Sequence, residues 1–273
     1  MNAPPLVIEA GRSERHYWRD LWRYRELFAF LAWRDILVRY KQTAIGVAWA
    51  IVQPFMTMIV FTIFGSWLHA NTGGVARPVF VFTALLPWQF FSAALTGASN
   101  SLVNNSHLIS KVYFPRLIVP LSAVITSLMD FFVSAIFLAG LMLCYRVAPS
   151  ANLWLAPLLV VLTFGAAFGA GLWLTALNVK YRDFRFLLPF IVQFGLYISP
   201  VAFTSDLVPV RFRFIYGLNP LVGIIDGFRW SILGQPADAL TTSLTTSVGI
   251  VALLIASGIW FFRRTERTFA DII

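Results

Sequence analysis

Residues Leu153 to Leu177 read LWLAPLLVVLTFGAAFGAGLWLTAL and contain no charged side chain. A helix needs roughly 20 consecutive apolar residues to cross the hydrocarbon core of a bilayer, and this stretch is long enough to do so. Its apolar run is continuous, whereas a strand of a membrane barrel alternates lipid-facing and lumen-facing residues over about ten positions. The stretch therefore predicts a transmembrane helix.

Five further runs share these features and are bounded by charge, proline or glycine. They cover residues 46–68, 79–97, 117–145, 187–203 and 240–262. Asp130 is the only formally charged residue in the six runs. The sequence thus predicts an all-α polytopic membrane protein with six transmembrane helices.

The composition supports this class and excludes several others. Of the 273 residues, 59% are hydrophobic and 12% are charged, a balance that cannot be closed around one soluble core. The 26 Phe and 10 Trp argue against a disordered chain. The single cysteine, Cys144, excludes an intrachain disulfide, and the three scattered histidines offer no metal-ligand spacing.

The net charge of +9 reflects membrane topology, so no nucleic-acid partner is expected. Sixteen Lys and Arg lie on one side of the six predicted helices. The five on the other side are Arg77, Arg146, Arg211, Arg213 and Arg229. The positive-inside rule therefore predicts that both termini are cytoplasmic. No short apolar run with a cleavage site near the start indicates a signal peptide.

The segment before the first run, residues 1–42, is expected to be a cytoplasmic N-terminus containing an amphipathic helix in the membrane interface. One apolar face recurs at spacings of four and three: Tyr17, Leu21, Tyr24, Phe28 and Leu31. Arginines lie roughly opposite on a helical wheel. The alternative is a basic anchor that only sets the topology. Residues 43–273 are expected to form the transmembrane domain.

Three connections between the runs carry further information. Residues 98–116 predict a first internal loop with a short amphipathic helix that ends near Pro115. Residues 178–186 form a second internal loop, and both loops are expected to contact a cytoplasmic partner. The external residues 204–239 are apolar but broken by proline and glycine, which predicts a re-entrant hairpin between spans five and six. An amphipathic loop on the outer leaflet is the alternative.

The sequence has no nucleotide-binding loop and little catalytic chemistry. None of the three lysines, Lys41, Lys111 and Lys180, lies in a GxxxxGK[ST] motif. No histidine lies inside a predicted span, which argues against an intramembrane hydrolase. Asp130 is either a substrate or proton site, or an interhelical contact that fixes packing. In the fourth span Gly165, Gly169 and Gly171 allow close helix approach, which favours packing within the chain over dimerisation.

Two helical faces combine aromatic rings with amide and hydroxyl groups. They are Trp49, Gln53 and Thr57 in the first span, and Phe186, Phe190, Gln193 and Tyr197 at the fifth. Aromatic planes pack on the apolar faces of sugar rings while polar groups exchange hydrogen bonds with the hydroxyls. The two faces are therefore candidate channel linings for a glycan, although aromatics in membrane helices also face lipid or core.

Four stretches of the sequence are distinctive: RDILVRYKQTAIGVAWAIVQPFMTMIVFTIFGSW from Arg34, NNSHLISKVYFPRLIVP from Asn104, LNVKYRDFRFLLPFIVQFGLYISPV from Leu177 and LNPLVGIIDGFRW from Leu218. They resemble ABC-2 type permeases of polysaccharide exporters, in the order found in that family. The resemblance covers most of the chain. It implies the ABC-2 (type V exporter) fold.

The resemblance also implies partners and an activity. The chain would homodimerise in the bacterial cytoplasmic (inner) membrane and pair with two copies of a separate ABC ATPase that binds Mg-ATP. This would explain the missing nucleotide-binding loop. The chain itself would bind no cofactor and catalyse no covalent step. The cargo would be a lipid-linked glycan such as O-antigen, capsular polysaccharide or teichoic acid.

Family roles can be transferred to matching positions. The residues implied in ATPase coupling are Asn104, Leu108, Lys111, Phe114, Pro115, Arg116, Tyr181, Arg182 and Asp183. The residues at the expected substrate entrance, where cations could meet a lipid pyrophosphate, are Arg34, Arg39, Tyr40 and Lys41. Two alternatives stay open: an ABC-2 permease for a lipid or small amphiphile, and a secondary transporter that uses Asp130.

Overall fold

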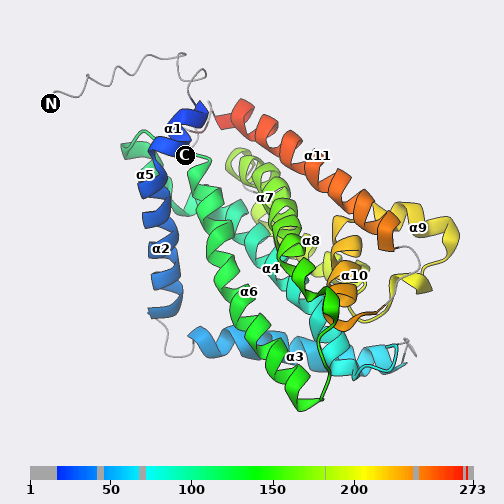
Figure 1. The fold of residues 1–273 in the computed structure, drawn as a ribbon. Helices are drawn as coiled ribbons and strands as arrows, with labels where there is room; N and C mark the ends of the chain where they lie inside the picture. Colours follow the sequence, from blue (N-terminus) through cyan, green and yellow to red (C-terminus); the bar gives the residue numbers. More distant parts are fainter. Residues whose placement is uncertain are drawn as a thin grey trace.

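The computed structural model describes residues 17–41, 46–67, 72–181, 183–235, 240–266 and 269, without the side chains of residues 46–50, Ser110 and Val210. Within these residues every regular element is a helix (Figure 1). The all-α prediction is therefore confirmed for the part of the chain that the structure describes. The side chain of Trp49 and the whole of Arg182 lie outside it.

Among the described residues, four helices are long and apolar enough to cross a membrane. They are α4 (Arg77–Asn104), α6 (Ile118–Cys144), α7 (Ala156–Lys180), which follows the short 3-10 helix η1 (Ala151–Leu155), and α11 (Leu240–Glu266). Of the other two predicted spans, the first forms α3 (Gly46–Trp67), which is apolar over its residues with described side chains, Ile51–Trp67, and the fifth forms the shorter apolar helix α8 (Phe184–Ile198). Helix α8 ends before Phe203 because Pro200 disfavours helical geometry at Ser199, which is extended.

Two predicted loop boundaries were wrong. Helix α4 continues to Asn104, so residues 98–104 are helical, and the first internal loop begins only at Asn105. Helix α7 likewise continues to Lys180. The cause is polar pairing between the two helices: Thr175 donates to the Ala98 carbonyl at 2.8 Å and Asn178 donates to the Ser99 carbonyl at 2.9 Å. Buried polar groups that find such partners do not end a helix.

The N-terminal segment forms α1 (Tyr17–Arg23) and α2 (Arg25–Lys41). The predicted apolar face packs on the protein, since Tyr17 and Leu31 are buried and Leu21, Tyr24 and Phe28 are partly buried against the core. Helix α2 lies beside α6 (Figure 1). The predicted apolar face therefore contacts protein, while Trp22, Phe30 and Trp33 are exposed on the same two helices, and the place of the segment in the membrane interface stays a prediction.

Helix α4 forms the centre of the fold and contacts α6, α7 and α10. Helices α7 and α11 pack through glycines, as expected for packing within one chain. A Cβ atom on Gly169 would lie 2.7 Å from the Ile255 backbone nitrogen, and one on Gly258 would lie 2.5 Å from the Gly169 carbonyl oxygen. Gly165 also faces α11, whereas Gly171 faces Ala98 of α4. The α7–α11 contact thus has no room for a side chain.

The predicted external region contains η2 (Ser205–Leu207), α9 (Val210–Gly217) and α10 (Pro220–Leu233). Helix α10 is buried from Leu221 to Arg229, whereas α9 is largely exposed. Arg229 donates to the carbonyl oxygens of Phe203 and Val201, both at 2.8 Å, and its guanidinium lies 3.8 Å from the ring centroid of Phe80. One buried cation therefore holds the irregular segment after α8 against α10 and α4.

Candidate functional site

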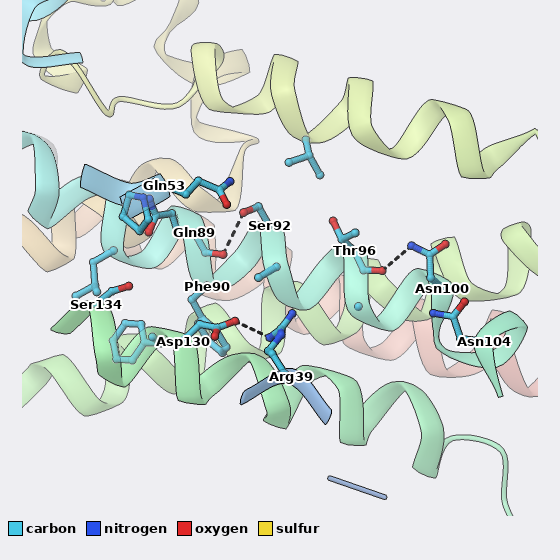
Figure 2. A pocket seen from close by; sticks show the side chains of 16 residues that line it. Arg39, Gln53, Gln89, Phe90, Ser92, Thr96, Asn100, Asn104, Asp130 and Ser134 are labelled. Carbon is cyan, nitrogen blue, oxygen red and sulfur yellow. Dashed lines mark hydrogen bonds and ion pairs between the residues drawn. The ribbon is translucent and has the colours of Figure 1, made fainter. Parts of the chain in front are cut away.

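A cavity of about 880 Å³ opens between α2, α3, α4 and α6, and Val192 of α8 also lines it. Its polar lining comes from four helices (Figure 2). These side chains are Arg39, Gln53, Gln89, Ser92, Thr96, Asn100, Asn104, Asp130 and Ser134. Of the predicted site residues, Arg39, Gln53 and Asn104 contribute to the lining, as does Asp130.

One face of α4 supplies most of this polar surface. We call Gln89, Ser92, Thr96, Asn100 and Asn104 the α4 polar stripe. Spacings of three and four place its members on one side of the helix, while Ala94, Ala98 and Leu102 are buried in the core. Amide and hydroxyl groups both donate and accept hydrogen bonds. The stripe can therefore bind the hydroxyls of a polyol in several orientations.

The sequence prediction missed the α4 polar stripe, although its spacing is visible in the sequence. Two features concealed it. The run over residues 79–97 is apolar overall, so its polar members look like minor interruptions. The last two members, Asn100 and Asn104, were assigned to a loop, whereas they belong to α4.

Asp130 is paired with the end of α2. The Arg39 guanidinium donates to Asp130 Oδ2 at 2.5 Å, and the Tyr40 hydroxyl donates to Oδ1. Burial and then the neighbouring Asp130 raise the pKa of Tyr40, so its hydroxyl stays protonated. Because both carboxylate oxygens have a partner, the arrangement favours the interhelical contact over a free ion-coupling site.

The Arg39–Asp130 pair also locates α2. Asp130 lies twelve residues into α6, which corresponds to about 18 Å along a helix. Helix α2 therefore extends beside α6 to this depth. Arg39 lies in residues 1–42, which were predicted to be cytoplasmic. For that reason the sequence analysis found no basic partner for Asp130.

The predicted entrance residues are divided between two places. Arg39 and Tyr40 meet at Asp130, but Arg34 reaches the junction of α4 and α5 (Ser106–Lys111), where its Nη2 donates to Asn105 Oδ1 at 2.7 Å. Arg34 also pairs with its neighbour Asp35 at 2.7 Å. Lys41, at the end of α2, is exposed.

The two predicted channel faces differ in position. Gln53 of α3 lines the cavity, but Thr57 is outside the lining and donates to the Gln53 carbonyl at 2.9 Å. The α8 face is exposed on the single chain: Phe186, Phe190, Gln193 and Tyr197 all lie outside the cavity lining. A channel role for α8 thus stays a prediction.

The loop expected to contact an ATPase has buried and exposed members. Phe114 is 3% exposed and Pro115 is also buried, so these two side chains anchor the loop, and their role in ATPase contact stays a prediction. Lys111 is exposed as expected. Val112 and Tyr113, which were not singled out from the sequence, are about half exposed. In the second loop Tyr181 and Asp183 are exposed.

Membrane-length helices that enclose a polar cavity are typical of membrane transport proteins. The comparison of sequences identifies the family. Residues 26–233 match the ABC-2 type transporter family, to which this chain therefore belongs. ABC-2 permeases are the membrane subunits of ABC transporters and work with a separate ATPase. The absence of a nucleotide-binding loop from this sequence agrees with that division of labour.

Several relatives are similar over most of their length. The O-antigen export system permease protein RfbA of Klebsiella pneumoniae is 26% identical over 250 residues, which cover 91% of this chain and 95% of that protein. RfbA of Myxococcus xanthus is 27% identical over 259 residues, covering 93% and 98%. The polysialic acid transport protein KpsM of Escherichia coli is 23% identical over 240 residues, covering 85% and 91%.

Proposed function

We propose that this chain is the channel-forming subunit of an ATP-driven exporter that moves a lipid-linked polysaccharide, with O-antigen favoured, across the bacterial inner membrane. The observation that carries the proposal is the cavity lined by the α4 polar stripe. It supplies hydroxyl and amide partners where a glycan would need them. The names of the relatives support a polysaccharide as cargo.

The proposed channel is completed by a second copy of the chain. The exposed aromatic face of α8 would then line the conduit opposite the polar stripe, stacking on sugar rings as they pass. A glycan longer than the membrane is thick has to thread through such a conduit. In this proposal α3 and α8 cross the membrane together with the four long helices, which gives six spans. Both termini are then cytoplasmic. Residues 204–239 form a re-entrant gate on the external side.

Two copies of the partner ATPase would bind Mg-ATP and drive the conduit between closed and open states through the two internal loops. We assign this contact to the exposed residues Lys111, Val112, Tyr113, Tyr181 and Asp183. The permease itself needs no cofactor in this scheme.

Co-purification of the tagged chain from its native membrane tests the proposal. We expect a stoichiometric ATPase, and a lipid-linked glycan in the bound fraction by mass spectrometry. An ATPase accompanied only by short lipids would identify a lipid exporter instead. Transport that needs an ion gradient and no ATPase would replace the ABC mechanism with a secondary transporter.

The α4 polar stripe makes a first prediction. Gln89→Leu combined with Thr96→Leu should lower export by about thirtyfold, since two polar partners of the glycan are lost at roughly 1 kcal/mol each. The measurement is glycan at the cell surface, normalised to permease in the membrane. Thr245→Leu is the control, because Thr245 is exposed on α11 outside the cavity. Equal export by the double variant and the control would contradict a glycan path along α4.

The substrate entrance makes a second prediction. Arg39→Ala combined with Lys41→Ala should reduce export severalfold, because a lipid pyrophosphate would lose its cationic partners and Asp130 would lose the Arg39 guanidinium. The matched control, Arg19→Ala combined with Arg23→Ala, removes the same charge from exposed positions on α1. Export at the normal rate with unchanged permease level would remove the entrance role from these two residues.

A further inference from the structure

The beginning of α1, the loop before α6 and the end of α11 meet at one end of the bundle (Figure 1). We call this contact the terminal junction and define it by five residues: Tyr17, Arg116, Arg263, Glu266 and Phe269. Arg116 and Glu266, which bond to each other there, are 150 positions apart in sequence. The junction belongs neither to the cavity nor to the exposed surface that we assign to the ATPase.

Glu266 makes the central contacts of the terminal junction. Its Oε1 accepts a hydrogen bond from the Arg116 backbone nitrogen at 2.9 Å, and its own carbonyl oxygen accepts one from Arg116 Nη1 at 2.5 Å. The Arg116 guanidinium lies 5.9 Å from the ring centroid of Phe269. The last turn of α11 is therefore bonded to both the backbone and the side chain of Arg116.

Helix α1 closes the other side of the terminal junction. The Arg263 guanidinium lies 4.6 Å from the ring centroid of Tyr17. Tyr17 is 7% exposed, and burial followed by the neighbouring Glu266 raises its pKa, which keeps the hydroxyl neutral. Phe262 and Phe269 are fully buried and pack edge to face at 5.5 Å. The junction is thus a packed part of the fold.

The loop that contains α5 is held at both of its ends. Arg34 of α2 bonds to Asn105 at its beginning, and Glu266 of α11 bonds to Arg116 at its end. Between these points Lys111, Val112 and Tyr113 are exposed. A push on these residues would therefore reach α2 and α11, provided that the two end contacts hold.

We propose that Glu266 is a positioning residue that fixes the end of this loop to α11, so that movement of the ATPase is transmitted to the helices. The proposal rests on the proposed role of the loop in ATPase contact. A loop released at Arg116 would still bind the ATPase, but it would absorb part of the movement. The expected defect is in coupling, with assembly preserved.

Three substitutions distinguish the effect of the length of the Glu266 side chain from the effect of its charge. Glu266→Gln keeps an acceptor oxygen at the same distance and removes the charge, Glu266→Asp keeps the charge on a side chain one methylene shorter, and Glu266→Ala removes both. Arg264→Ala is the matched control, because Arg264 is an exposed cation two residues away. Each variant is purified with its ATPase, and glycan exported per ATP hydrolysed is measured in proteoliposomes.

We expect the export-to-hydrolysis ratio to fall about threefold or more in the Ala and Asp variants, as loss of the one hydrogen bond made by the Glu266 side chain predicts. The Gln variant and the Arg264→Ala control should stay near normal, and all four should retain the ATPase. An unchanged ratio in the Ala and Asp variants, or an equal loss in the Gln variant, would overturn the positioning role. Loss of ATPase together with activity would also overturn it, since it would make Glu266 an assembly residue. Failure of the unmodified chain to bind any ATPase would refute the proposed function itself.

Discussion

A Gly258→Leu variant is expected to lose most of its folded protein from the membrane. A Cβ atom at position 258 would lie 2.5 Å from the Gly169 carbonyl oxygen, and the leucine adds three further carbons beyond it. The two nearest atoms belong to the Gly169 backbone and the third is Leu172 Cβ, so no flexible side-chain end can rotate away. Overpacking of this kind costs about 1–3 kcal/mol or more, and separation of α7 from α11 would also break the Trp173–Phe261 stack at 4.1 Å.

The measurement is the yield and thermal midpoint of the detergent-solubilised protein, read by fluorescence-detected gel filtration. Gly249→Leu is the matched control, because Gly249 lies on the same helix and a Cβ atom there meets nothing within 4 Å. That variant should fold normally, since leucine favours a helix over glycine. If both variants behave alike, the close α7–α11 contact is wrong.

An Arg229→Met variant is expected to lose export almost completely and to raise the resting ion leak of the membrane. Arg229 is 3% exposed, and its guanidinium donates hydrogen bonds to the carbonyl oxygens of Val201 and Phe203 in the segment after α8. Methionine fills the space but leaves those carbonyls unpaired, and Asp226 loses its buried cationic neighbour. Leaving a buried acceptor without its partner costs about 1–3 kcal/mol for each carbonyl. The proposed external gate should then lose its position.

Arg229→Lys should recover little of this function, because an ammonium group is a point charge and cannot match a guanidinium that spans two acceptors. Arg211→Ala is the control, since Arg211 is an exposed cation on α9 in the same region. The two readouts are surface glycan and the conductance of planar bilayers that contain the protein. Normal export and a tight resting bilayer in the methionine variant would show that the segment after α8 does not depend on Arg229.

Hydropathy predicted the helices because each long run is apolar and each interruption carries proline, glycine or charge. It failed where polar residues are satisfied inside the fold. The stretch after Gly97 looks like a loop because Ser99, Asn100 and Ser101 are polar, but Thr175 and Asn178 of α7 bind its carbonyls and the helix continues. Hydropathy measures preference for water, and it cannot register a partner that lies on another helix.

The candidate site was predictable only in part, for the same reason. Gln53 was chosen for its spacing and does line the cavity, and Asn104 was chosen by resemblance. The pairing of Asp130 with Arg39 spans 91 positions, so no local pattern indicates it. Arg229 was counted as one external cation among five, because charge counting does not distinguish an exposed arginine from a buried one.

The α4 polar stripe contains no charged group; Ser92 and Asn100 already bond within the fold, and the amides and hydroxyl of Gln89, Thr96 and Asn104 can each donate or accept. Such a lining can form hydrogen bonds with the hydroxyl groups of many sugars and does not select one of them. A bacterium that gained the enzymes for a new surface polymer would then need no new permease to display it. Antigenic change could proceed in the synthetic enzymes while this membrane subunit stayed the same.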